Sequence, residues 1–93
     1  MGMDEIAAKM RERVSASNFG QSVKFDCGSD GVIVIEGNTV STEDGPADCV
    51  ISLDRNDLAA MVTGELNPTA AFMQGKLKID GDMSVAMQLS QVI

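Results

Sequence analysis

Residues 67–89 read NPTAAFMQGKLKIDGDMSVAMQL, and the first part of this stretch predicts a short helix. Asn67 stands directly before Pro68, so a capping side chain precedes a proline at the first helical position. Gly75 supplies the residue type at which helices commonly end. We therefore expect a helix from Pro68 to about Gln74.

The rest of this stretch predicts a strand and then another helix. Residues 76–79 alternate between charged and apolar side chains, which is the period of a half-buried strand. Asp80 and Gly81 predict a turn, and Asp82 is a suitable N-cap for a last helix. That helix is apolar nearly all round, through Met83, Val85, Ala86, Met87 and Leu89.

The N-terminal segment predicts an amphipathic helix. Ile6, Met10 and Val14 recur at spacings of four, and Asp4 can cap the helix. We expect it to stop at Asn18-Phe19-Gly20. Its basic residues leave two interpretations open, a solvated helix face and an anion site, of which we favour the first; they are Lys9, Arg11 and Arg13.

The middle of the chain predicts strands, because its apolar residues alternate with polar ones. Three segments joined by turns at Asp30-Gly31 and Gly37-Asn38 predict a meander; they are residues 22–27, 32–35 and 39–42. The second is apolar on both faces, which indicates an interior strand. After an acidic break at 43–46, residues 47–53 resume the alternation as a fourth strand.

A helix is expected after this fourth strand. Asp54 is a suitable N-cap, and Thr63-Gly64 ends the pattern. Its apolar stripe consists of Leu58, Met61 and Val62.

Length and composition exclude several classes of protein. The 93 residues fit one domain, 1–93, because a second would leave neither half enough chain for a core. Seven basic and 14 acidic residues give a charge of 7 − 14 = −7, which repels nucleic acid and anionic lipid surfaces. No apolar run approaches the roughly 18–20 residues of a membrane span, and no signal peptide is evident. We expect a soluble, cytoplasmic protein.

Catalytic and metal chemistry find little support. The chain has no histidine, the commonest general base, so we expect no enzyme activity. Cys27 and Cys49 form neither a disulfide framework nor a zinc motif, so reduced, buried thiols are expected. The carboxylate pairs, such as Asp80 with Asp82, lack the other ligands of a calcium loop and are interpreted as caps and turns. No phosphate-binding loop is present, and we expect no cofactor or metal.

Methionines concentrate in the last third of the chain, at 61, 73, 83 and 87. Methionine repacks around ligands of varied shape, which suits an apolar cavity. Ordinary core packing in a small protein with few aromatics is the alternative, and composition alone favours it.

Residues 67–89 closely resemble the signature of the sterol carrier protein 2 family. The shared features are the Asn67-Pro68 start, the Phe72-Met73 pair before QGKLKI, the Gly81-Asp82-Met83 turn and the final AMQL helix. The resemblance extends upstream to Ala47. Residues 1–46 match only in the order of the elements, and they lack the bulky aromatic residues of many members.

This resemblance implies an α+β fold in which helices pack on one face of a five-stranded mixed, mostly antiparallel sheet. Members hold fatty acyl chains, acyl-CoA, sterols or other lipids in an apolar tunnel without converting them. Carried over by position, the tunnel residues are Phe72, Met73, Gln74, Leu77, Met83 and Met87. Periodicity adds Ile33, Ile35, Leu58, Met61 and Val62 as wall candidates.

Three questions follow from this resemblance. Gln74 is either a partner for a lipid head group or a helix cap. An empty cavity of roughly 400 Å³ would cost on the order of 10 kcal/mol at most, so we expect it to be filled by lipid or partly collapsed onto methionines. The function is lipid binding and transfer or, alternatively, an accessory role in lipid or quinone biosynthesis. In the second case an enzyme or a second subunit would cover the apolar groove.

Overall fold

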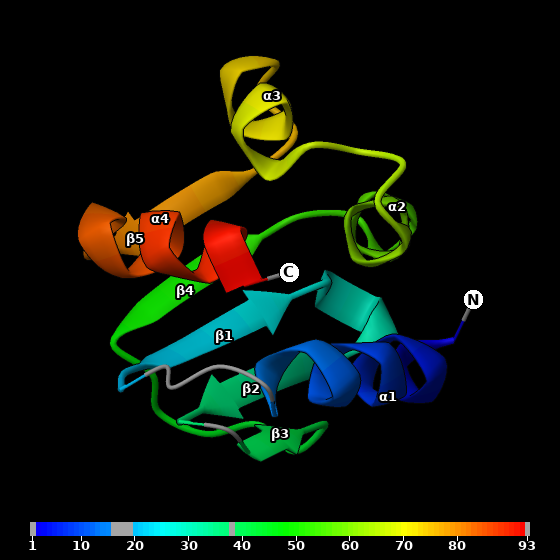
Figure 1. Cartoon of the computed structure of the whole chain (residues 1–93), viewed down its shortest axis with the longest axis vertical. Coiled ribbons are helices and arrows are strands. Elements are labelled where there is room, and N and C mark those ends of the chain that lie inside the picture. The colour runs from blue at the N-terminus through cyan, green and yellow to red at the C-terminus, as the bar shows by residue number, and fades with distance from the viewer. Residues whose placement is uncertain (1, 16–19, 38, 93) are drawn as a thin grey trace.

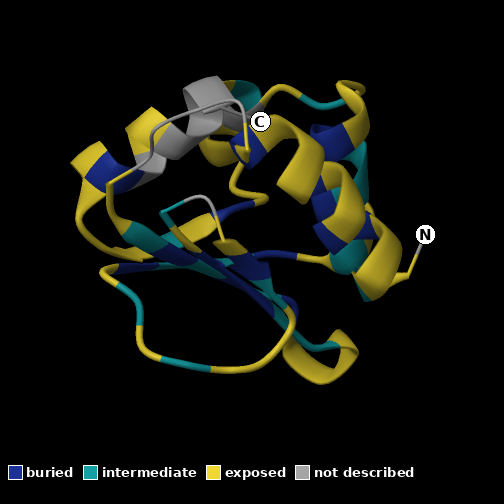
Figure 2. Ribbon diagram, turned by 60° about the horizontal axis from the view of Figure 1, so that its bottom comes forward, coloured by how far each residue is buried: buried dark blue, intermediate teal, exposed yellow. Residues whose placement is uncertain are grey.

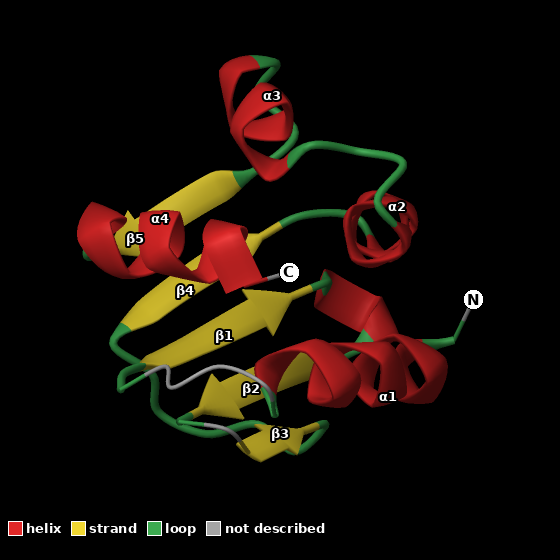
Figure 3. Cartoon of the chain, in the orientation of Figure 1, coloured by secondary structure: helices red, strands yellow, loops and turns green. Residues whose placement is uncertain are grey.

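The computed structural model describes residues 2–15, 20–37 and 39–92 (Figure 3). The elements follow the order that the sequence predicts, with an added 3-10 turn, η1. They are α1 (Met3–Val14), β1 (Ser22–Asp26), η1 (Gly28–Asp30), β2 (Val32–Glu36), β3 (Thr39–Ser41), β4 (Cys49–Ser52), α2 (Arg55–Thr63), α3 (Pro68–Met73), β5 (Lys78–Gly81) and α4 (Met83–Val92).

The strands form one five-stranded sheet in the order β3-β2-β1-β4-β5. β1, β2 and β3 are the predicted antiparallel meander, and β2 lies in the interior as its two apolar faces indicate. β4 pairs parallel with β1 and antiparallel with β5. The predicted mixed, mostly antiparallel sheet is therefore confirmed.

The helices lie on one face of this sheet (Figure 1). α1 packs over β2 and β3, α4 packs over β1, β4 and β5, and α2 packs beside α1. The connection between β3 and β4 passes the opposite face (Figure 2), where the Lys24 ammonium lies 2.7 Å from the Asp44 carboxylate. The two faces of the sheet thus have different covers, helices on one side and a polar loop on the other.

The core lies between the sheet and the helices. Side chains at alternate positions of β1 and β2 point into it, and those of Val23, Phe25, Ile33 and Ile35 are fully buried. α1 contributes a stripe of four fully buried residues, Ile6, Ala7, Met10 and Val14. This periodicity matches the amphipathic pattern of the sequence.

The start of α1 differs from the prediction. The N-cap position is Gly2, so the expectation that Asp4 caps the helix is wrong. Asp4 lies in the first turn, where its negative charge interacts favourably with the positive end of the helix dipole. The predicted stop at Asn18 and Phe19 lies outside the described residues.

The basic face of α1 is exposed, as expected, and Lys9, Arg11 and Arg13 all lie on it. Arg11 also donates from Nε and Nη2 to the Val40 carbonyl oxygen, at 3.2 and 3.1 Å. One guanidinium therefore ties α1 to β3.

The predicted helix boundaries hold where a side chain or a glycine sets them. Asn67 Oδ1 accepts hydrogen bonds from the Thr69 and Ala70 amides at 2.8 and 3.4 Å, and Asp82 Oδ1 accepts from the Ser84 amide at 2.9 Å. Gly64 ends α2 at φ 86°. Asp54 occupies the N-cap position of α2 but makes no capping hydrogen bond.

β5 begins two residues later than predicted, and Asp80-Gly81 belongs to the strand, so the expected turn there is wrong. Pairing with β4 sets the register, with Ile79 opposite Ile51 and Gly81 opposite Cys49. A side chain at Gly81 would put a Cβ 2.7 Å from the Asp48 carbonyl oxygen. The glycine therefore permits a close backbone approach between strands.

The two thiols are free and buried, as predicted. Cys49 lies on β4, whereas Cys27 falls just after β1 and outside the strand expected for it. Among the described residues, no helix combines the length and the apolar character needed to cross a bilayer.

Candidate lipid-binding site

The predicted wall residues of the sheet lie in the helix-covered core. Ile33 and Ile35 stand opposite Phe25 and Val23 in the β1–β2 ladder, and all four side chains are fully buried. Their β-branched or aromatic side chains fit the pleated surface that α1 covers. They form the floor of the layer between the sheet and the helices.

α2 supplies the neighbouring wall. Its stripe of Leu58, Met61 and Val62 is at most 3% exposed, and it belongs to the same core cluster as the sheet residues. Leu77, between α3 and β5, is 8% exposed and joins this cluster as well. Six of the eleven predicted site residues therefore come together in the core; they are Ile33, Ile35, Leu58, Met61, Val62 and Leu77.

α3 turns the predicted site residues outward. Ala71 is fully buried and anchors the helix, whereas Phe72 is 42% exposed and Met73 is 80% exposed. Gln74 is exposed and takes the C-cap position of the helix. The placement of Gln74 fits a helix cap, and its exposed amide also remains accessible to a ligand.

α4 shows the same division as α3. Val85 is buried, while Met83 and Met87 are 43% and 52% exposed. Together with Phe72 and Met73, they are the large apolar side chains that the described residues leave exposed. We call these four residues the exposed apolar set.

The exposed apolar set lies on the two helices that flank β5 in the chain (Figure 1). α4 covers β1, β4 and β5, while α3 extends beyond the β5 edge of the sheet. The five exposed site residues, Gln74 and this set, thus lie on α3, at its end or on α4, whereas the six buried ones belong to the core cluster.

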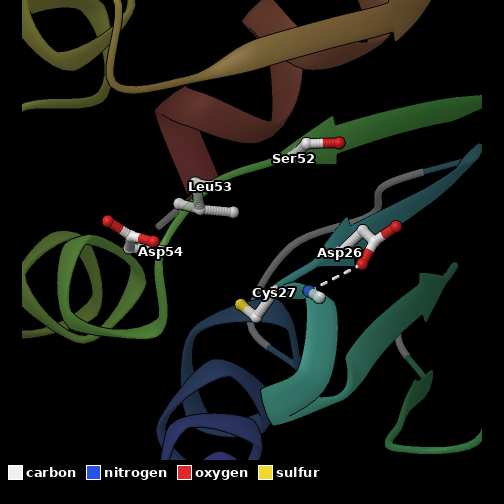
Figure 4. A pocket seen from close by; sticks show the side chains of 6 residues that line it. Asp26, Cys27, Ser52, Leu53 and Asp54 are labelled. Atoms are coloured by element: carbon white, nitrogen blue, oxygen red, sulfur yellow. Dashed lines mark hydrogen bonds between the residues drawn. The ribbon is translucent and has the colours of Figure 1, made fainter.

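A polar hollow of about 340 Å³, which the sequence analysis does not predict, opens at the carboxyl ends of β1 and β4 (Figure 4). It is lined by Asp26, Cys27, Gly28, Ser52, Leu53 and Asp54. The hollow exists because β1 and β4 are parallel, so their ends meet at one edge. No local sequence motif predicts which strands become neighbours. The sequence therefore contains no signal from which this hollow could be identified.

The chemistry of this hollow does not favour a nucleophile. Burial, as the largest cause, and the charges of Asp30, Asp26 and Asp54 together raise the pKa of the Cys27 thiol to about 11, while the charge of Arg55 opposes them. Because the thiolate is the reactive form, Cys27 is protonated and unreactive at neutral pH. Asp26 Oδ1 accepts a hydrogen bond from the Gly28 amide at 2.9 Å, which fixes the turn.

Metal binding finds no support among the parts of the chain that the structure describes. Within residues 2–15, 20–37 and 39–92, no three Cys, Asp or Glu side chains are grouped so as to hold an ion. Asp80, one of the carboxylates that the sequence analysis considers, lies in β5, and Asp82, the other, caps the start of α4.

Known proteins resemble this chain in both sequence and fold. The chain is 46% identical over 57 residues to bovine sterol carrier protein 2, an alignment covering 61% of this chain and 10% of that protein. The matched part therefore spans about a tenth of that relative's length.

Two solved structures share the fold. The solution structure of palmitated SCP2L2 from Aedes aegypti matches with a TM-score of 0.81 at 20% identity, covering 99% of this chain and 94% of that one. The ubiquinone synthesis protein UbiJ-SCP2 matches with a TM-score of 0.61 at 18% identity, covering 89% and 73%. The model of the SCP-2 sterol transfer family matches residues 3–93, and the chain belongs to this family.

Proposed function

We propose that this chain binds a long acyl chain or a similar lipid without converting it, between the helix-covered face of the sheet and α2, α3 and α4. The observation that carries the proposal is the exposed apolar set, which leaves four large apolar side chains in water beside the core. Such an exposed group commonly marks a binding site. Family membership and the palmitated neighbour support a lipid as the ligand.

The proposed site has an interior and a mouth. Six buried residues, Ile33, Ile35, Leu58, Met61, Val62 and Leu77, form the wall that contacts the inner part of the alkyl chain. The exposed apolar set surrounds the mouth, and Gln74 bonds the polar head group. Each methylene that leaves water contributes about 0.8 kcal/mol, so chain length rather than head-group chemistry dominates the affinity.

Methionines allow this site to change volume. Met61, Met73, Met83 and Met87 have unbranched side chains that adopt many rotamers, so they fill the space when no ligand is present. This limits the energetic cost of an empty cavity in a chain of 93 residues. Native mass spectrometry of freshly purified protein is expected to reveal a stoichiometric lipid, and its absence would leave the collapsed form as the ligand-free state.

Displacement of a fluorescent fatty acid tests the site. Phe72→Asp is expected to weaken binding about tenfold or more, because a carboxylate at the mouth must lose water when the acyl chain enters. Thr69→Asp places the same charge on an exposed position of α3 and is expected to leave binding nearly unchanged. Equal affinity of Phe72→Asp and the unaltered chain would contradict this site.

An accessory role in a lipid or quinone biosynthesis complex is the second candidate. It is favoured by the similarity in fold to UbiJ-SCP2, a ubiquinone synthesis protein. In that case an enzyme covers the exposed apolar set. Recovery of biosynthetic enzymes with the chain from native extract, together with weak binding of free fatty acid, would favour this role over a carrier.

A further inference from the structure

We propose that two copies of this chain form a symmetric dimer in which their β5 strands pair antiparallel, with Ile79 of one copy opposite Ile79 of the other. We call this contact the β5 pairing. It joins the two five-stranded sheets edge to edge. Such a dimer goes beyond the proposed function and does not depend on lipid binding.

β5 offers a free edge for this contact. It is the last strand in the order β3-β2-β1-β4-β5 and, among the described residues, pairs with β4 alone. On its outer side, the β5 backbone makes no hydrogen bond to any residue that the structure describes. Such an edge is a template for pairing with another chain. At the opposite edge of the sheet, in contrast, the Val40 carbonyl oxygen of β3 already accepts hydrogen bonds from Arg11.

The charges along this edge form a self-complementary series. Residues 76–82 read KLKIDGD, so two lysines precede Ile79 and two aspartates follow it at the same spacings. After Glu65, these four are the only charged side chains in the sequence, and their charges sum to 2 − 2 = 0. All four are exposed, and none forms an ion pair within the described residues. A second copy can therefore supply the opposite charges that they lack.

The two charged residues within β5 share one face of the strand. Ile79 packs against the core, whereas Lys78 and Asp80 alternate with it and therefore point to the opposite face of the sheet. On that face their partners on β4 are Ser52 and Val50, which carry no charge. The charges of Lys78 and Asp80 are thus not neutralised within their own sheet.

The register with Ile79 opposite Ile79 pairs every one of these charges. In an antiparallel pair about this position, Lys78 faces Asp80 of the second copy, and two-fold symmetry repeats the contact. Just beyond the strand ends, Lys76 faces Asp82 of the second copy in the same way. A shift of the two-fold axis by one residue in either direction places Lys78 opposite Lys78 or Asp80 opposite Asp80, and like charges directly opposite each other are destabilising. Electrostatics therefore select this symmetric register.

The ends of the β5 pairing also bring apolar side chains together. α3 lies beyond the start of β5 (Figure 1), and there the residue of the second copy opposite Leu77 is Gly81, which has no side chain to crowd α3. Phe72 and Met73 are exposed near this end of the strand. Met83 is exposed at the other end, which is the end that the second copy brings alongside. The dimer therefore also removes apolar surface from water.

Sedimentation equilibrium of the full 93-residue chain tests the β5 pairing. Because β5 is four residues long, we expect a weak, reversible dimer. Lys78→Asp and Asp80→Lys are each expected to weaken dimerisation about tenfold or more, since each turns two attractive cross-strand pairs into repulsive ones. An equimolar mixture of the two variants is expected to dimerise as the unaltered chain does, because every charge then faces an opposite one again.

Lys9→Asp is the matched control, since it makes the same change of charge as Lys78→Asp at an exposed position of α1. It is expected to change dimerisation less than threefold. A loss equal to that of Lys78→Asp, or a mixture of the two β5 variants that stays monomeric, would overturn the β5 pairing. So would an unaltered chain that stays monomeric up to about 1 mM.

Hydrogen exchange of the unaltered chain gives a second readout that needs no variant. The amides of β5 that face away from β4 are expected to exchange more slowly at high chain concentration than at low concentration. Protection of these amides that does not depend on concentration would contradict the β5 pairing.

Fatty-acid displacement separates the dimer from the proposed function. A chain that dimerises in this way but binds no fatty acid contradicts the proposed function alone. A chain that binds fatty acid but stays monomeric contradicts the β5 pairing alone.

Discussion

α1 and the pair of α3 and α4 use apolar side chains in opposite ways. α1 buries Ile6, Ala7, Met10 and Val14 completely against the sheet and α2. α3 and α4 bury Ala71 and Val85 but leave the exposed apolar set in water. Both regions have helical apolar periodicity, so the pattern alone does not separate a core helix from a binding helix.

Burial indicates that α1 mainly stabilises the fold, and we propose that α3 and α4 mainly bind the ligand. Burial of a complete stripe gives α1 a large hydrophobic contribution to folding. Apolar side chains that stay exposed contribute little to folding, and a group of them commonly marks a binding surface. We expect substitutions in the two regions to separate accordingly.

The largest difference is expected between two methionines. Met10→Ala removes a fully buried side chain and should lower the free energy of unfolding by about 2–5 kcal/mol. Met73→Ala alters a side chain that is 80% exposed and should change it by less than about 0.5 kcal/mol. Urea unfolding of lipid-free protein measures both, and similar losses would remove the distinction between the regions.

Gly81 tests how closely β5 approaches β4. Gly81→Ala should destabilise by about 1–3 kcal/mol or more, because φ is 114° and the new Cβ would meet the Asp48 carbonyl oxygen at 2.7 Å. Gly20→Ala is the control, since no heavy atom lies within 4 Å of its added Cβ. Thermal unfolding provides the measurement, and a neutral Gly81→Ala would contradict the close approach of β5 to β4.

Arg11 tests the attachment of α1 to β3. Arg11→Ala removes two hydrogen bonds to the Val40 carbonyl oxygen and should cost about 1–2 kcal/mol. Arg13→Ala on the same helix should cost less than about 0.5 kcal/mol, because Arg13 is also exposed but does not make the hydrogen bonds to Val40 that Arg11 makes. Equal effects in chemical denaturation would mean that the guanidinium contact adds nothing to stability.

Cys27, which follows β1 and lines the polar hollow, should affect stability only at alkaline pH. Its pKa rises from 9.0 to about 11 on folding, so the unfolded chain loses the proton first. Stability is therefore unaffected by this group below pH 9.0 and falls as the pH rises toward about 11. Cys27→Ser should flatten this part of the stability curve relative to the unaltered chain.

Local signals predict much of the fold, because their causes act within a few residues. The Asn67 cap, the glycine at the end of α2 and the alternation over β1 and β2 each appear where expected. The register of β5 is different, because pairing with β4 and the close approach at Gly81 act between distant segments. The polar hollow escaped prediction for the same reason, since it requires the parallel pairing of β1 and β4.

The sequence by itself determined the family, the order of the elements, the sheet and which residues could contact a lipid. The order of the elements follows from spacing, capping and apolar periodicity, which are encoded locally. The family, the sheet and most of the candidate lipid contacts are what the resemblance of residues 67–89 implies. Only the tertiary structure decided which site residues are buried and which are exposed, because burial depends on the segment that packs above each side chain. It also turned Phe72 and Met73 outward on α3, whereas Ala71 of the same helix is fully buried.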